Sequence, residues 1–426
     1  MQYIKNVIKA LFSDTSRDTL ILFVGNSFSA LFGFIFVYIL TRRLTVSEFG
    51  IFSAAANLIV IISSFTDLGI TTAMINFVST KLGDNDKNGA SRYLKASFII
   101  RLISILVVSG VVALIPKFIS VNLLATADYT VSYWVAVISI GLTAWLTFPY
   151  AMMAYKKFWQ SVVLDWSLGI PRILFFLGLG MMFPVNLNLA LASYGLSTIL
   201  PIIFGFSVIG IKFLKTKTYK SDYVDLAKFS GWLGVNRVIS SISGRLDVTM
   251  LANLTTAGIV GQYSIASRLS SFVIVLSSSL GSVLSTRFAR FNNKEEEKKY
   301  LIKSSLFILP IIFGVIIWIL IAKPFVLILF GEKYYESIII FKYLLFSMIP
   351  FVIATPAVTA IVHSMRKPIY IGVFSFIQVV MIFIFNVYFI NLFNGIGPAI
   401  AFLITNSILA IYSWVIVFRY YFKHED

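Results

Sequence analysis

The chain has 426 residues, of which 58% are hydrophobic and 12% are charged, and its mean hydropathy is +0.90. A soluble domain cannot bury that much apolar surface, and runs long enough to cross a bilayer recur, so the sequence predicts an all-α polytopic membrane protein. Because the chain has no Cys and only two His, we expect no disulfide framework, no metal centre and no cofactor.

The pattern of apolar runs predicts a short N-terminal segment and twelve transmembrane helices. Residues 1–18 form the segment, and their apolar positions at helical spacing predict an amphipathic helix lying at the membrane interface. The predicted spans are residues 19–40, 49–79, 92–115, 131–154, 161–183, 187–211, 229–253, 259–287, 301–322, 337–362, 369–391 and 396–418. The expected domains are an N-terminal lobe of six spans (19–211), a basic linker (212–228), a C-terminal lobe of six spans (229–420) and a tail (421–426).

The formal net charge of +17 reflects membrane topology rather than affinity for nucleic acid. Of the 35 Lys and Arg, 24 lie in the loops or at the span ends on the side of the N-terminus, 5 lie on the opposite side and the other 6 lie inside spans. Basic loops mark the cytoplasmic side, so we expect both termini, and the linker, to be cytoplasmic. We expect the lipid bilayer, and no nucleic acid, as a partner.

An internal repeat divides the sequence into two halves. The stretch EFGIFSAA at Glu48–Ala55 matches IVGQYSIA at Ile259–Ala266, an offset of 211 residues, and Asp67-Leu68-Gly69 matches Ser279-Leu280-Gly281 at 212. Pro149 and Pro356, each followed by a basic pair, are 207 residues apart. An even number of spans in each half predicts parallel six-helix lobes related by a pseudo-two-fold axis around a central cavity. The alternative is chance similarity between apolar helices.

Charged residues inside the spans are the candidate functional residues. They are Arg101, Arg172, Arg237, Arg245 and Arg268, with Asp67 and Asp247. A charge near the bilayer centre costs roughly 2.5–3.5 kcal/mol on insertion, so such residues usually face a bundle interior or an aqueous cavity. Arginine offers planar paired donors to phosphate oxygens, so the excess of arginine predicts a phosphate-bearing cargo. The aspartates are candidates for coupling to a proton or sodium gradient, although Asp247 could instead form a structural salt bridge with Arg268.

Two amides complete the candidate set, because Asn26 and Asn236 could donate hydrogen bonds to sugars or, alternatively, join neighbouring helices. The sequence contains no zinc-protease, nucleotide-binding, P-loop or nucleophile-elbow motif. The predicted loops on the outer side are also too short to hold a catalytic domain. We therefore expect a transporter of the secondary type rather than an enzyme.

Three stretches carry a resemblance to a known family. They are TRRLTVSEFGIFSAAANL after the first span, TDLGI in the second span and GRLDVTMLANLTTAGIVGQYSIASRL from the seventh span onward. They resemble the polysaccharide flippase family, which includes O-antigen flippases, of the multidrug/oligosaccharidyl-lipid/polysaccharide exporter superfamily. The resemblance extends over essentially the whole chain in span count, length and two-half layout.

The resemblance implies a cavity that opens alternately to the two faces of a bacterial inner membrane. The implied cargo is an undecaprenyl-diphosphate-linked oligosaccharide, moved to the outer leaflet for the biosynthesis of O-antigen, lipopolysaccharide or another surface polysaccharide. Deep basic residues would hold the diphosphate, and a polysaccharide polymerase and a chain-length regulator are candidate partners. Two alternatives remain open: a multidrug or cation exporter of the same superfamily, and a membrane polymerase or ligase acting on lipid-linked glycans.

Overall fold

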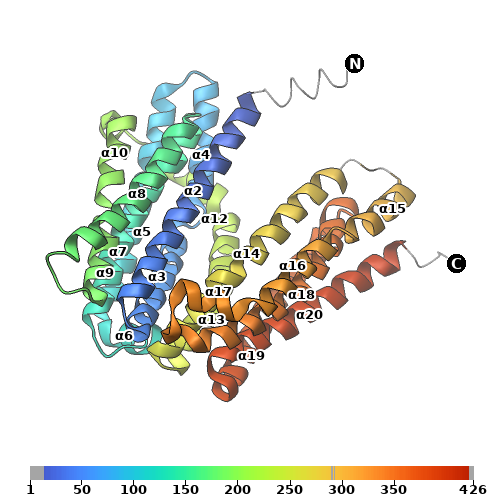
Figure 1. Ribbon diagram of the computed structural model, residues 1–426. Helices are drawn as coiled ribbons and strands as arrows, with labels where there is room; N and C mark the ends of the chain where they lie inside the picture. The colour runs from blue at the N-terminus through green and yellow to red at the C-terminus, as the bar shows by residue number, and fades with distance from the viewer. Residues whose placement is uncertain (1–13, 289–290, 292, 422–426) are drawn as a thin grey trace. The chain divides into compact units, whose positions relative to one another are not determined.

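All the regular elements described by the structure are helices. The computed structural model describes residues 14–288, 291 and 293–421 (Figure 1). The helices of the first half are α2 (Asp14–Arg43), α3 (Val46–Asp67), α4 (Ile70–Gly83), α5 (Lys87–Leu114), α6 (Pro116–Leu123), α7 (Thr130–Ala154), α8 (Phe158–Leu179), α9 (Leu187–Leu196), α10 (Ile199–Ile209), α11 (Lys212–Lys215) and α12 (Lys220–Ser243). Those of the second half are α13 (Leu246–Leu254), α14 (Ala257–Phe288), α15 (Lys294–Ser305), α16 (Ile308–Leu320), α17 (Ala322–Phe330), η1 (Glu332–Tyr334), α18 (Tyr335–Thr359), η2 (Ala360–Ser364), α19 (Pro368–Phe393), η3 (Asn394–Ile396) and α20 (Gly397–Tyr421).

The expectation of an all-α multi-pass membrane protein is confirmed. Within the described residues, ten segments are long and apolar enough to cross a membrane, and one of them, Pro368–Tyr421, contains both α19 and α20. The seventh expected span, 229–253, is not among the ten; it falls on α12 and α13, which carry charged residues. Of the expected interfacial segment, residues 1–13 lie outside the described residues, and residues 14–18 open α2. Residues 422–426 of the expected tail also lie outside them.

By contact, the chain divides into two compact units, Met1–Arg245 and Leu246–Asp426, called unit 1 and unit 2 below. The division falls after α12 rather than in the basic linker at 212–228, because α12 packs against α3, α4 and α5 of unit 1. The domain boundaries expected from the sequence place residues 229–243 of this helix in the second lobe. In Figure 1, unit 1 runs from blue through green, and unit 2 runs from yellow to red.

Polar contacts fix the linker to unit 1. Lys95 Nζ donates to the backbone carbonyl of Thr216 at 2.8 Å, and the Tyr93 hydroxyl donates to Asp225 at 2.9 Å. Arg92 lies 3.7 Å from the buried carboxylate of Asp222. These three donors come from the first turns of α5, so the start of α12 is fastened to the same end of unit 1.

The internal repeat is visible in the positions at which five pairs of helices begin. Helices α3, α5, α7, α8 and α9 have counterparts in α14, α15, α18, α19 and α20, each of which begins 205 to 211 residues later. The basic pairs noted in the sequence adopt the same turn: Lys156 and Arg366 have φ values of 56° and 55°, and each is followed by a lysine that precedes a new helix. A left-handed conformation in a non-glycine residue is uncommon, so this shared turn strengthens the case for a duplication.

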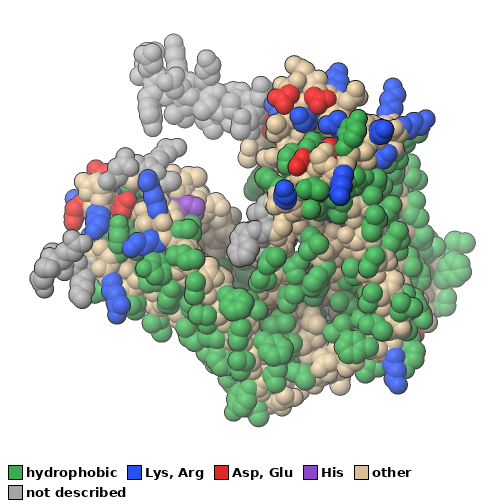
Figure 2. All heavy atoms as spheres, turned by 180° about the vertical axis from the view of Figure 1, so that it is seen from behind, with side chains coloured by type: hydrophobic (Ala, Val, Ile, Leu, Met, Phe, Trp, Pro, Cys, Tyr) green, Lys and Arg blue, Asp and Glu red, His purple; other side chains and the backbone are tan. Residues whose placement is uncertain are grey.

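The surface of each unit suits a bilayer. Many large hydrophobic side chains are exposed, including those along α5, α16 and α19. Figure 2 shows hydrophobic side chains covering the flank of unit 1 and Lys and Arg gathered at one end of it. Inside unit 1, Phe98, Phe148, Phe206 and Phe213 pack ring against ring and connect α5, α7, α10 and α11.

Candidate functional site

The site begins at a break in the second predicted span. The sequence predicts one helix over 49–79, but the structure has two, because α3 ends at Asp67 and α4 begins at Ile70. Between them Leu68 (φ 40°, ψ 33°) and Gly69 (φ 77°) adopt left-handed conformations. A left-handed residue other than glycine costs roughly 1–2 kcal/mol, so the surrounding contacts must hold Leu68 in this geometry.

The Asp67 carboxylate bridges the break. Its Oδ1 accepts hydrogen bonds from the hydroxyl of Thr71 and from the Thr71 backbone N–H, the latter at 3.2 Å. A carboxylate is unfavourable at the C-terminal end of a helix and favourable at an N-terminal end. Asp67 is the last residue of α3, and its carboxylate accepts hydrogen bonds from the first turn of α4.

Two arginines from other helices lie against the same carboxylate. Arg101 Nε of α5 is 3.7 Å from Asp67 Oδ1, and Arg237 Nη1 of α12 is 3.0 Å from Asp67 Oδ2. The Asp67 and Arg101 side chains are each 1% exposed, whereas the Arg237 side chain is 37% exposed. We call these three residues the Asp67 cluster. One carboxylate faces two guanidinium groups, so the formal net charge of the cluster is +1.

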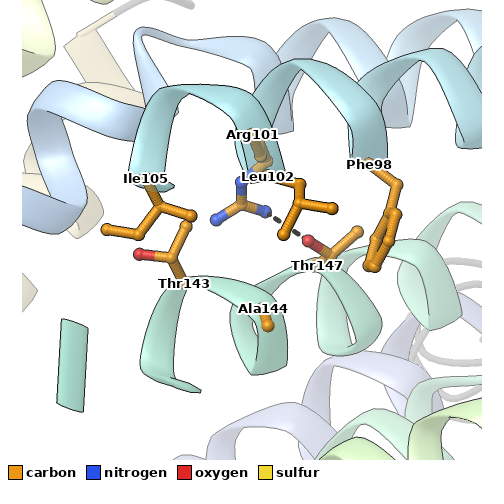
Figure 3. Close-up of a pocket in the computed structure, with 7 residues that line it drawn as sticks. All are labelled: Phe98, Arg101, Leu102, Ile105, Thr143, Ala144 and Thr147. Carbon is orange, nitrogen blue, oxygen red and sulfur yellow. Dashed lines mark hydrogen bonds between the residues drawn. The ribbon is translucent and has the colours of Figure 1, made fainter. Parts of the chain in front are cut away.

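Arg101 is enclosed by helices α5 and α7. Its Nη1 donates to Thr147 Oγ1 at 3.1 Å, and its guanidinium points from α5 toward α7 beside Thr143 and Thr147 (Figure 3). Among the residues that the structure describes, Nη2 has no hydrogen-bond acceptor. The adjoining cavity has a volume of about 10 Å³ and is lined mainly by apolar groups, so it has room for about one water molecule.

A polar seam joins α3 to α12 and to Arg245, which follows the end of α12. The amide of Asn57 donates to the backbone carbonyl of Arg245 at 3.1 Å, and Arg245 Nη1 donates to Asn57 Oδ1 at 2.9 Å. Ser64 and Ser241 hydroxyls are hydrogen-bonded at 2.8 Å. Together with the pair of Asp67 and Arg237, these contacts are spaced along the seam and fix the register of α12.

Glycine allows α12 to reach the broken span. A Cβ added to Gly234 would lie 2.3 Å from the carbonyl oxygen of Leu68, which is backbone and cannot swing away. The glycine therefore lets the two chains approach at the turn that follows Asp67. This approach brings Arg237, one turn further along α12, to the carboxylate.

The other predicted residues of unit 1 lie in different surroundings. Arg172 of α8 stacks over the ring of Tyr194 at 3.9 Å and lies 5.6 Å from that of Phe36, a cation–π arrangement. Asn26 is exposed on α2. Asn236 belongs to α12, and its side chain lies outside the described atoms.

Asp247 and Arg268 belong to unit 2. Asp247 of α13 is buried and accepts a hydrogen bond from the hydroxyl of Tyr263, which α14 contributes. Arg268 is an exposed residue of α14. Their assigned roles in binding and coupling stay predictions.

Several partners of the charged residues were not foreseen from the sequence. The contact between Thr71 and Asp67 could have been predicted, because a hydroxyl four residues after a carboxylate can reach back to it across one helical turn. The sequence did not indicate the contacts of Thr147, Tyr194 and Tyr263. Polar residues are common in apolar helices, and their neighbours depend on how the helices pack. Over the part of the chain that the structure describes, no group of three or more His, Asp or Glu could hold a metal ion.

These features define a class: an all-α multi-pass membrane protein built by internal duplication, with arginines held inside one unit by a single carboxylate. The profile of the family described as polysaccharide biosynthesis protein matches residues 15–291, which is more than half of the chain. The chain therefore belongs to this family, and the resemblance drawn from the sequence is confirmed.

Named relatives agree with the assignment. The chain is 23% identical over 417 residues to the probable low-salt glycan biosynthesis flippase Agl15 of Haloferax volcanii, covering 91% of this chain and 80% of the relative. Its fold is similar to that of the lipid II flippase MurJ in an inward closed conformation, with a TM-score of 0.73, 15% identity and coverage of 93% and 87% of the two chains. It is also similar to an inward-facing multidrug resistance transporter of the MATE family and MOP superfamily, with a TM-score of 0.70, 13% identity and coverage of 91% and 93%.

Proposed function

We propose that this protein is a flippase for lipid-linked oligosaccharides, with undecaprenyl-diphosphate-linked repeat units as its cargo. Membership of the polysaccharide biosynthesis protein family supports a glycan cargo. The relative from Haloferax volcanii, a probable glycan biosynthesis flippase, and the fold shared with a lipid II flippase support translocation as the activity. Translocation by alternating access needs no chemical step in the protein.

The single observation that carries the choice of cargo is the excess of arginine in the Asp67 cluster. Two guanidinium groups share one carboxylate, and one of them, that of Arg237, is partly exposed. A diphosphate complements this charge and can accept paired hydrogen bonds from a guanidinium. A cationic drug would be repelled by it, which argues against the multidrug or cation exporter that the fold also permits.

The proposal also covers the direction of transport and the membrane in which the protein works. The cargo would enter from the cytoplasmic leaflet of a bacterial inner membrane and leave in the outer leaflet, with both termini of the protein cytoplasmic. It would serve the synthesis of O-antigen, lipopolysaccharide or another surface polysaccharide, where a polymerase and a chain-length regulator are the partners to test. We assign coupling to a proton or sodium gradient to Asp247 or Asp67; transport that persists unchanged after both gradients collapse would reject this assignment.

The test is the sidedness of the cargo in cells that lack the protein. Spheroplasts are treated with a membrane-impermeant glycosidase, and lipid-linked oligosaccharides are extracted and quantified. The flippase proposal expects oligosaccharides to accumulate in a protected, cytoplasmic pool and to become accessible once the wild-type protein is restored. Accumulation of accessible but unpolymerised units would instead identify a polymerase or ligase, and no accumulation would reject a role in this route.

A further inference from the structure

We propose that the Asp67 cluster works by charge exchange: Arg237 binds the cargo phosphate, Asp67 competes with the cargo for Arg237, and Arg101 holds Asp67 in position. The inference rests on the proposed function, because it gives each residue a role in binding the diphosphate of the cargo. It also separates residues that sequence reasoning had placed in one group of binding arginines. Three observations support these different roles: the unequal exposure of the two arginine side chains, the different contacts of the two Asp67 oxygens and the small volume of the cavity beside Arg101.

Arg101 acts through Asp67 rather than on the cargo. Its side chain is 1% exposed, and the cavity beside its guanidinium has room for about one water molecule. A diphosphate, which is several times larger than a water molecule, has no space there. Since Arg101 also donates to Thr147 and lies 3.7 Å from Asp67, its charge and its position both serve to orient the carboxylate.

Arg237 is the member of the cluster that a ligand can reach. Its side chain is 37% exposed, and Nη1 lies 3.0 Å from Asp67 Oδ2. This contact is an ion pair by distance, but Oδ2 receives no aligned hydrogen bond from it. A guanidinium carries five N–H donors, and a diphosphate offers it several well-placed acceptors. The pair with Asp67 is therefore the contact that the cargo can replace.

The two oxygens of Asp67 make the exchange reversible. Oδ1 is held by Thr71 and lies against Arg101, whereas Oδ2 faces Arg237. When cargo takes Arg237, Asp67 keeps the partners on Oδ1 and stays in place. It can then take Arg237 back and so promote release. A carrier needs such a competitor, because cargo that is bound too tightly is not delivered.

The test uses farnesyl diphosphate as the probe and the full-length protein in detergent micelles, with affinity measured by isothermal titration calorimetry. Arg237→Ala should weaken binding by about tenfold or more, since hydrogen bonds between ionised groups are the strong ones. Arg101→Met should weaken binding by several-fold, because the charge of Asp67 is then opposed by Arg237 alone. Ser243→Ala, whose hydroxyl donates to the backbone carbonyl of Ile239 in its own helix at 2.7 Å, is the matched control and should leave the affinity unchanged.

The decisive variant is Arg101→Met combined with Asp67→Asn. It removes both buried charges together, so it avoids the unpaired charge that could unfold either single variant. With its competitor neutralised, Arg237 should bind the probe at least as tightly as in the wild type. A structural role, or direct contact between Arg101 and the cargo, would instead leave the double variant as weak as Arg101→Met or weaker.

The outcomes separate this inference from the proposed function. If the wild type binds farnesyl diphosphate and Arg237→Ala binds equally well, charge exchange is wrong and the flippase proposal stands. If the double variant binds the probe as weakly as Arg101→Met or more weakly, the roles assigned to Arg101 and Asp67 are wrong. If neither the wild type nor the double variant binds the probe, the diphosphate cargo is wrong and the inference fails with it.

Discussion

The same stretch of the internal repeat is broken in unit 1 and continuous in unit 2. Asp67-Leu68-Gly69 interrupts the second span, whereas its match, Ser279-Leu280-Gly281, lies inside the unbroken helix Ala257–Phe288. The residues at the first position make different contacts. The Ser279 hydroxyl donates to the carbonyl of Val275 in its own helix at 2.9 Å, while the Asp67 carboxylate serves the next helix and two arginines.

The difference teaches how a duplicated fold can become specialised. Arg101 has Ile308 as its counterpart 207 residues later, so the second half has no arginine at the matched position to pair with a carboxylate at position 279. A break in the helix and a charged cluster therefore occur together in one half and are both missing at the matched position of the other. Matched substitutions in the two halves can test this link.

The largest effect is expected from removing the carboxylate itself. Asp67→Leu leaves the buried Arg101 with Thr147 as its remaining hydrogen-bond partner and should lower the free energy of unfolding by about 3–5 kcal/mol. Ser279→Leu, at the matched and exposed position, should change it by less than about 0.5 kcal/mol. Equilibrium unfolding in detergent micelles measures both. Equal losses of unfolding free energy for the two variants would contradict the proposed difference between the halves.

A smaller effect is expected where α12 meets the broken span. Gly234→Ala places a Cβ 2.3 Å from the carbonyl oxygen of Leu68. Because the neighbour is backbone, overpacking should cost about 3 kcal/mol and displace Arg237 from Asp67. Gly231→Ala on the same helix is the control; nothing lies within 4 Å of its Cβ, so it should be neutral or slightly stabilising. If Gly234→Ala is as stable as this control, close approach at Gly234 is not needed for α12 to pack against the broken span.

The smallest effect is expected at the third residue of the two matched stretches, Gly69 in unit 1 and Gly281 in unit 2. Gly69 has a φ of 77°, so Gly69→Ala should cost about 1–2 kcal/mol of unfolding free energy through backbone strain. Its match, Gly281, is helical, and an added Cβ would meet Thr355 and Thr359 at 3.6 Å and 3.7 Å, which is ordinary contact. Gly281→Ala should therefore stabilise by about 0.5–1 kcal/mol. Opposite signs in one unfolding assay are the expected result; the same sign would count against it.

Local pattern was enough for much of the fold. The apolar runs located the spans, and the basic pairs after Pro149 and Pro356 marked a turn that the structure repeats. The pattern failed at 49–79, where a long apolar run hid the break. Hydropathy averages over a window, and one aspartate with a glycine two residues later does not lower it enough to end a predicted helix.

The candidate residues were identified by charge alone, and their grouping came from packing. Asp67, Arg101 and Arg237 were each singled out because a charge in a membrane span needs a reason. Their association was not foreseen, since they are separated by up to 170 residues and come from α3, α5 and α12. Arg172 gave the same signal but stacks on Tyr194 instead.

The sequence by itself determined the class of molecule, because hydropathy, helical period and the placement of lysine and arginine are local properties of the chain. It also determined the duplication and the presence of excess positive charge inside the spans. Only the tertiary structure decided that α12 packs with unit 1, that the second span breaks at Asp67 and that one arginine is enclosed while another is exposed. Those outcomes depend on which side chains meet across helices, and a buried charge is stable only where a partner from another helix reaches it.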